Sequence, residues 1–198
     1  INAEHPDLVL IAGDIIDISV RPLLEERVAE EFHRLKAPVY ACLGNHEYYS
    51  GEQHALQFYH KAGITLLRDS VAKIGNIVVI GRDDRTNAHR HSLREIMRQA
   101  KLMADSNGRV KEFAILLDHQ PYHLEEAEHN GIDFQFSGHT HHGQVWPASW
   151  ITDALYEKAY GVLRKGNTQY CVSSGMGIWG GKFRIGTQSE YVVLTVGR

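Results

Sequence analysis

Short apolar runs, each followed by a turn and a polar side chain, constrain the fold of this chain more than any other feature. Three of these runs are continuous, at residues 8–12, 39–43 and 113–117, and residues 132–137 also have the character of a buried strand. Continuous apolar runs of this length are typical of strands that are buried on both faces, as in parallel sheets. Because segments with helical character lie between the runs, the sequence predicts an α/β fold.

The remaining elements follow from spacing and turn residues. Helices are expected at residues 21–36, 52–62 and 92–104, the last with Ser92 and Glu95 placed as a capping box, and Pro121 suits the first turn of a short helix. Shorter strands are expected at residues 64–67, 71–74, 77–81, 170–173 and 191–196. The turn at Gly75-Asn76 predicts a hairpin, which makes the sheets mixed. A length of 198 residues fits one domain, 1–198.

Composition excludes some classes of function. The net charge is −3 and no basic run occurs, so we expect no nucleic-acid partner. No apolar run approaches the roughly 18 residues needed to span a bilayer. Cys42 and Cys171 lie in apolar runs, which favours two buried free thiols, with one disulfide as the alternative. The 13 histidines are unusual for a chain of this size.

Side chains of the kinds that bind metals follow the ends of the four long runs: Asp14, Asn45, His119 and His139. In open α/β sheets, ligands bind at the edge formed by the carboxyl ends of the strands, so these four residues should converge there. Neutral imidazole is a common ligand for metals near neutral pH. Histidines also occur in turns without a chemical role, but convergence from four separate strands favours a metal site over that alternative.

Four sequence blocks, at residues 13–17, 44–47, 119–121 and 138–141, occur in an order and spacing that resemble the calcineurin-like metallophosphoesterases over nearly the whole chain. The resemblance implies a four-layer α/β/β/α sandwich of two mixed sheets. Residues 143–144 and 173–180 look like the branch of YkuE-like and YaeI-like phosphoesterases. Members of that branch are often attached to membranes, and they include a UDP-2,3-diacylglucosamine hydrolase.

The family pattern implies a site for two divalent metal ions. Asp14 would bridge the two metals, whereas Asn45, His119 and His139 would complete the second metal site and His141 would belong to the first. Histidine ligands favour zinc, iron or manganese over magnesium. The resemblance implies hydrolysis of a phosphomonoester, phosphodiester or pyrophosphate bond by a hydroxide that bridges the metals.

Two further residues are expected to act in catalysis. His46 would be the acid that protonates the leaving group or stabilises the transferring phosphoryl group. Glu47, its neighbour in the sequence, would orient His46 or raise its pKa.

One family motif is missing from this sequence. The family begins with a strand that ends in an aspartate, one spacer residue and a histidine, and residues 1–12 leave no room for it. We therefore expect an N-terminally truncated chain without the first strand, which binds one metal well and a second metal poorly. An alternative is a metal-binding domain without turnover.

The substrate class follows from the resemblance and from one apolar cluster. We expect a phosphorylated small molecule or a lipid-linked nucleotide as the substrate. Apolar residues at 146–163 are expected to pack a helix on the core, with a surface for a membrane or for acyl chains as the alternative. On the branch resemblance, the chain is expected to be the soluble domain of a membrane-associated bacterial protein, and its oligomeric state is left open.

Two polar or glycine-rich motifs have more than one reading. Residues 82–85, Arg-Asp-Asp-Arg, follow a strand, and a salt-bridged loop is favoured over contact with the substrate. The glycines at 175, 177 and 180 match a dinucleotide-binding pattern, but the residues after them do not predict the helix which that pattern requires. An oxidoreductase is therefore disfavoured.

Overall fold

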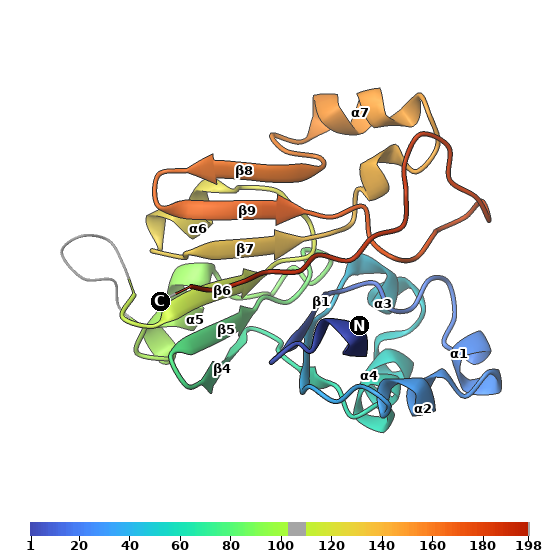
Figure 1. Ribbon diagram of the computed structural model, residues 1–198, viewed down its shortest axis with the longest axis horizontal. Coiled ribbons are helices and arrows are strands. Elements are labelled where there is room, and N and C mark those ends of the chain that lie inside the picture. The colour runs from blue at the N-terminus through green and yellow to red at the C-terminus, as the bar shows by residue number, and fades with distance from the viewer. Residues whose placement is uncertain (103–109, 198) are drawn as a thin grey trace.

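The computed structural model describes residues 1–102 and 110–197 and contains two sheets (Figure 1). The smaller sheet has the order β1-β2-β3 and is parallel, with β1 at Val9–Ala12, β2 at Val39–Cys42 and β3 at Thr65–Leu66. The larger sheet has the order β4-β5-β6-β7-β9-β8. Its strands are Ser70–Ile74, Ile77–Gly81, Phe113–Leu117, Phe134–Ser137, Gly161–Lys165 and Thr168–Val172, numbered β4 to β9 along the chain.

Seven α-helices and two 3-10 helices occur in the described residues. The α-helices are α1 at Arg21–Glu25, α2 at Val28–Phe32, α3 at Asn45–Tyr49, α4 at Glu52–Lys61, α5 at Leu93–Gln99, α6 at Glu125–His129 and α7 at Ala148–Leu155. The 3-10 helices are η1 at Asn2–Glu4 and η2 at His141–Gly143. Within the described ranges, no helix is long and apolar enough to cross a membrane.

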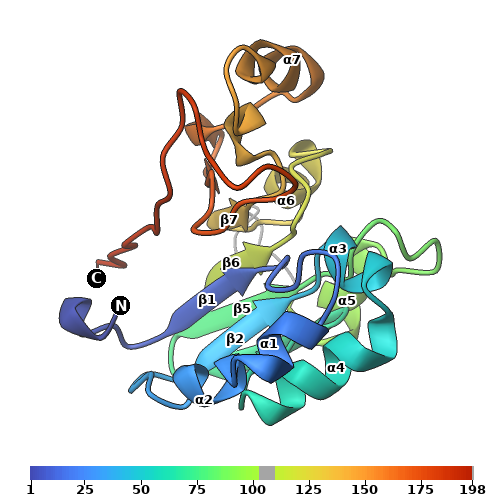
Figure 2. The same ribbon diagram turned by 90° about the vertical axis from the view of Figure 1, so that its right-hand side faces the viewer.

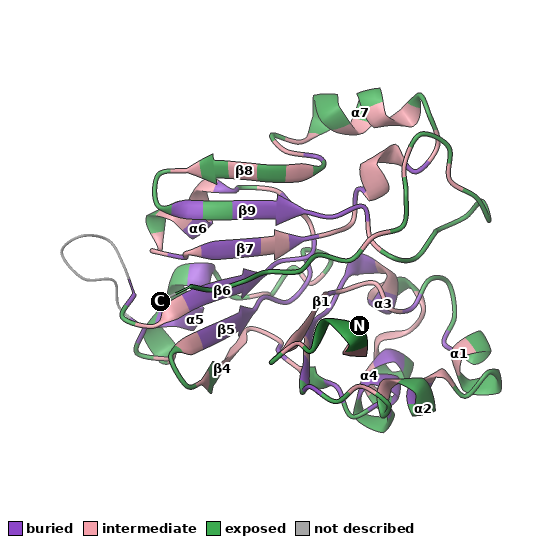
Figure 3. Cartoon of the chain, in the orientation of Figure 1, coloured by how far each residue is buried: buried purple, intermediate pink, exposed green. Residues whose placement is uncertain are grey.

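Three apolar clusters fill the spaces between four layers, which confirms the expected α/β/β/α sandwich. Helices α1, α2 and α4 lie beside the small sheet in Figure 2, and α4 contributes the buried ring of Phe58 to their shared cluster. Alternation along β5 sends Val78 and Ile80 towards α5 and Val79 into the space between the sheets. Figure 3 shows this burial along β5, β6, β7 and β9.

Several predicted elements differ in the structure. The helix expected at 21–36 is two helices, because Arg27 adopts a left-handed backbone with φ of 56° and interrupts the hydrogen bonding. The helix that starts at Ser92 has the predicted capping box with Glu95 but ends at Gln99, and residues 103 and 104 of the prediction lie outside the described residues. No helix begins at Pro121; α6 starts at Glu125.

Two predictions about strands are wrong, and one about cysteines is confirmed. The strand expected at residues 191–196 does not form, because this segment does not pair with the edge of either sheet. An apolar segment needs a neighbouring strand to become part of a sheet. The smaller sheet is parallel rather than mixed, since the hairpin around Gly75 lies in the larger sheet. Cys42 and Cys171 are buried free thiols in the cluster between the sheets.

Candidate metal centre

Two glycines bring the ends of β1 and β2 into close contact. A Cβ on Gly13 would lie 2.5 Å from the backbone nitrogen of Gly44, and φ of Gly13 is 84°. A Cβ on Gly44 would collide with the carboxylate of Asp14. The absence of side chains at both positions therefore lets Asp14 and Asn45 approach each other.

The four strand-end residues converge as the sequence predicts. Ligand atoms of Asp14, His119 and His139 all lie within 4.8 Å of one another. Asn45 joins them, because its Oδ1 lies 2.8 Å from Nδ1 of His139 and 3.2 Å from Nε2 of His119. One carboxylate, one amide oxygen and two imidazoles are a donor set that fits zinc, iron or manganese.

A backbone hydrogen bond fixes the ring of His119. Its Nδ1 donates to the carbonyl oxygen of Ala12 at 2.5 Å, which leaves Nε2 directed at Asp14 Oδ2 at 2.9 Å. Metal-binding histidines commonly donate from the second ring nitrogen in this way. His119 is thus held in the orientation that a metal ligand needs before any metal binds.

Nearby charges and burial shift the pKa values of His119 and His139 in opposite directions. Burial lowers the pKa of His119, but the charge of Asp14 and the hydrogen bonds to Asp14 and Ala12 outweigh it and raise the pKa to about 9. The same ion pair holds the pKa of Asp14 below its usual value, against the effect of burial. Burial and the charge of His119 lower the pKa of His139 to about 4. Without metal, His119 therefore carries a proton and His139 does not.

Metal affinity is expected to rise with pH because the metal must displace the proton of His119. The folded pKa of about 9 lies above the ordinary value of 6.5, so the proton competes throughout the neutral range. Competition by one proton predicts about a tenfold gain in affinity per pH unit, levelling off above the pKa. Manganese titrations by calorimetry between pH 6.5 and 8.5 would measure this slope, and an affinity independent of pH would contradict the protonated state of His119.

His141 is not part of this cluster. Its Nδ1 lies 3.4 Å from Nη2 of Arg184, whose Nη2 also donates to the carbonyl oxygens of Ser174 and Gly175. Burial, followed by the charge of Arg184, lowers the pKa of His141 to about 4. The structure therefore places His141 beside a guanidinium, and its assignment to the first metal site stays a prediction.

His46 lies at the start of α3, next to the metal cluster. Its backbone N–H donates to Asp14 Oδ1 at 3.0 Å, and its Nδ1 lies 2.9 Å from the backbone oxygen and 3.1 Å from Oδ1 of Asp17. A ring held through Nδ1 presents Nε2 to a reacting group. Asp17 is a partner that the sequence reasoning did not assign, although its position in the Gly-Asp-Ile-Ile-Asp block was a signal.

Glu47 does not orient His46, in contrast to the expectation. Its carboxylate is fully buried and accepts three backbone N–H groups, from Gly44 at 2.7 Å, Asp14 at 2.9 Å and Ile16 at 3.1 Å. Burial and the charge of Asp14 raise its pKa despite these bonds. Glu47 therefore fixes the two loops that carry the metal ligands, and its side chain acts on the backbone instead of on the neighbouring imidazole.

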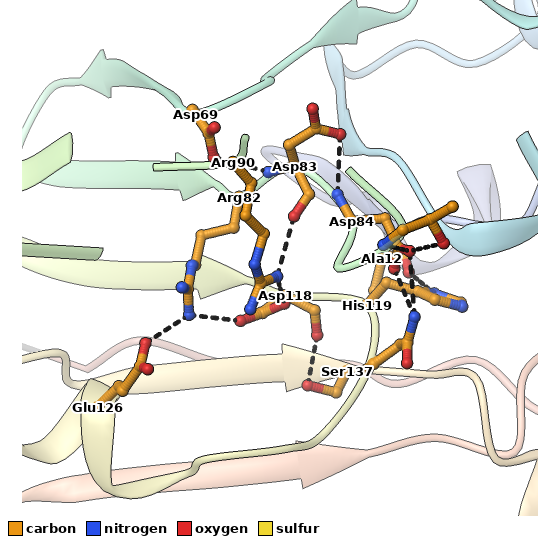
Figure 4. A network of polar contacts seen from close by, with 12 residues as sticks. Ala12, Asp69, Arg82, Asp83, Asp84, Arg90, Asp118, His119, Glu126 and Ser137 are labelled. Carbon is orange, nitrogen blue, oxygen red and sulfur yellow. Dashed lines mark hydrogen bonds and ion pairs between the residues drawn. The ribbon is translucent and has the colours of Figure 1, made fainter. Parts of the chain in front are cut away.

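The polar loop after β5 forms a buried network beside the cluster (Figure 4). Arg82 pairs with Asp118 at 3.0 Å and with Glu126 at 2.7 Å, and Arg90 also reaches Asp118. The salt-bridged interpretation is therefore confirmed for Arg82. Asp118 points into this network and away from the metal ligands.

Comparison with known proteins agrees with the fold. Residues 1–143 match the family described as "Calcineurin-like phosphoesterase". An uncharacterized metallophosphoesterase of Aquifex aeolicus is 31% identical over 98% of this chain and 74% of its own length. One from Helicobacter pylori J99 is 31% identical over 98% of this chain, which spans 52% of that relative. A 5'-nucleotidase precursor from Thermus thermophilus shares the fold, with a TM-score of 0.54, 16% identity, and coverage of 85% of this chain and 39% of that one.

Proposed function

Because this chain belongs to the calcineurin-like phosphoesterase family, we propose that it hydrolyses a phosphoester or pyrophosphate bond with the aid of a bound divalent metal. One observation carries the proposal: a carboxylate, an amide oxygen and two imidazoles from four strand ends meet at one point. These groups would hold the metal. When bound, the metal would supply Lewis acidity and lower the pKa of water near the substrate.

The residues at and around the metal ligands would have separate roles in the reaction. Asn45 is a neutral ligand, which limits the negative charge that an anionic phosphate meets. His46, with Nδ1 held by Asp17, would carry a proton on Nε2 towards the leaving oxygen. Glu47 and Ala12 keep Asp14 and His119 in place through backbone bonds. No covalent intermediate with the protein is needed.

Turnover of p-nitrophenyl phosphate and bis-p-nitrophenyl phosphate with added manganese tests this function. Hydrolysis of either ester that disappears with chelator and returns with metal is the expected result. Metal binding without any turnover would favour the second candidate, a metal-binding domain without catalysis. The contact of His141, which was expected to serve the first metal site, with the guanidinium of Arg184 is the observation that favours that candidate.

Lipid is the partner that best fits the surface next to the metal centre. Helix α7 has no buried residue and stands apart from the sheets (Figures 1 and 3). All three tryptophans of the chain are exposed here, Trp146 by 58%, Trp150 by 67% and Trp179 by 52%. Hydrogen bonds connect these segments, since the backbone N–H of Trp146 donates to the carbonyl oxygen of Ile185 and the side-chain Nε2 of Gln144 donates to that of Trp179. Tryptophan is characteristic of the membrane interface.

Replacing Trp146 and Trp150 together by serine is expected to reduce binding to phospholipid vesicles. Loss of each indole that inserts into the bilayer should lower partitioning by about 10- to 100-fold, given roughly 1.5–3 kcal/mol for burying a large apolar side chain. Vesicle flotation measures the bound fraction. Val193→Ser removes an equally exposed apolar side chain elsewhere and should leave flotation unchanged. If the unaltered protein does not float with the vesicles, the result would contradict a membrane-facing role of this surface. Equal flotation of the unaltered protein, the double tryptophan variant and Val193→Ser would contradict it as well.

A further inference from the structure

Within the described part of the chain, Arg85 differs from the arginines around it in having no carboxylate partner. Arg82 pairs with Asp118 and Glu126, and Arg90 pairs with Asp118. Across residues 1–102 and 110–197, Arg85 takes part in no ion pair, and its side chain is exposed. Its guanidinium carbon lies 4.7 Å from the ring centroid of Tyr122. A cation held over an aromatic face keeps its N–H groups available for an anion.

Two tyrosines connect this arginine to the metal cluster. The ring of Tyr156, at the end of α7, lies 6.2 Å from that of His139 and 4.7 Å from that of Tyr122. The hydroxyl groups of the two tyrosines are 3.2 Å apart and form a hydrogen bond. Both tyrosines are half-buried, so part of each side chain faces solvent. The series from His139 to Arg85 therefore leads outward from a metal ligand to an unpaired charge.

Hydrogen bonds fix the two loops that carry Arg85 and Tyr122. Asp84 accepts from Nε2 of Gln120 at 2.9 and 3.1 Å, and Tyr122 donates its backbone N–H to the oxygen of Gln120 at 2.8 Å. Figure 4 shows Asp84 beside His119. Arg85 follows Asp84 directly, so the guanidinium projects from an anchored point of the chain. Such preorganisation reduces the entropy that ligand binding costs.

We propose that Arg85, Tyr122 and Tyr156 form a subsite for a second anionic group of the substrate, separated from the reacting phosphorus by a sugar or another ring-sized spacer. The inference rests on the proposed function, because it assigns a substrate class to the same site. The contacts run in series from His139 to Tyr156, Tyr122 and Arg85, so we place the second anionic group one ring-sized spacer away from the reacting phosphorus. The tyrosines would contact the spacer, and Arg85 would bind a carboxylate or phosphate through paired N–H groups.

Two phosphonates of equal size test the subsite by binding alone. We choose 4-carboxybenzylphosphonate and 4-carbamoylbenzylphosphonate, which differ in one negative charge, titrated by calorimetry into the manganese-loaded protein. The unaltered protein should bind the carboxylate about tenfold more tightly, as a hydrogen-bonded charge pair implies. Arg85→Gln should bring the ratio of the two Kd values close to one without changing the Kd of the carbamoyl ligand. Arg85→Lys should retain part of the preference.

Arg164→Gln is the matched control. Arg164 is an exposed arginine on β8, and it lines a surface hollow with Phe113 at the start of β6, the opposite end of the strands from the metal cluster. Its loss should leave the preference for the carboxylate unchanged. Binding of both phosphonates with equal affinity, or an unchanged ratio in Arg85→Gln, would overturn the subsite and leave the proposed function standing. Failure of both ligands to bind would count against the proposed function as well.

Discussion

Replacing His46 by alanine is expected to lower kcat for p-nitrophenyl phosphate by about 100- to 10,000-fold, the usual contribution of a general acid. The imidazole lies beside Asp14 and is held by Asp17 through Nδ1. The metal should remain bound, because the contact of residue 46 with Asp14 is made by the backbone N–H, which alanine keeps. Steady-state kinetics together with a metal titration separates these two effects.

His129→Ala is a suitable control, since His129 is exposed at the end of α6. It should leave both kcat and the metal affinity unchanged. A normal kcat in His46→Ala would remove His46 from the reaction. Loss of the metal from that variant would instead assign the residue to the metal site.

Replacing Glu47 by alanine is expected to lower the free energy of unfolding by about 3–5 kcal/mol, because three buried backbone donors lose their acceptor. Those donors belong to Gly44, Asp14 and Ile16. The affinity for metal should also fall, because the loops that carry Asp14 and Asn45 lose the hydrogen bonds that hold them in place. Urea unfolding monitored by circular dichroism measures the first effect, and manganese titration measures the second.

Glu30→Ala provides the comparison for this change. Glu30 is exposed on α2 and pairs with Arg27, and exposed ion pairs of this kind contribute roughly 0–1 kcal/mol. The free energy of unfolding of Glu47→Gln should lie between those of Glu47→Ala and Glu30→Ala, because one amide oxygen can replace only part of the carboxylate. Equal stability of Glu47→Ala and Glu30→Ala would show that the backbone bonds of Glu47 are not needed.

The metal cluster could be predicted because its members depend on strand ends. Parallel strands share one edge, so β1 and β2 bring Asp14 and Asn45 together at the edge of the small sheet, and β6 and β7 bring His119 and His139 together at the edge of the large sheet. The packing of the two sheets then brings the two pairs to one point. The four layers were expected from the family resemblance, because the pattern of apolar runs alone predicts only an α/β fold.

The partners of His46 and His141 could not be predicted, because they depend on the paths of loops. The carboxylate next to His46 in sequence turns to the backbone, and Asp17 approaches the imidazole from another loop. His141 meets Arg184, which lies 43 residues further along the chain. The expectation that a helix within 146–163 packs on the core is wrong for α7, and the alternative of an exposed surface fits better, since apolar spacing predicts which residues share a face but not whether anything covers that face.

The most direct test of the metal centre is an anomalous difference map from crystals of the zinc- or manganese-loaded protein. The structure predicts a strong peak about 2.0–2.2 Å from Oδ of Asp14, Oδ1 of Asn45, Nε2 of His119 and Nδ1 of His139. Stoichiometrically bound metal with its peak at another position, or with none of these four residues as a ligand, would contradict the account.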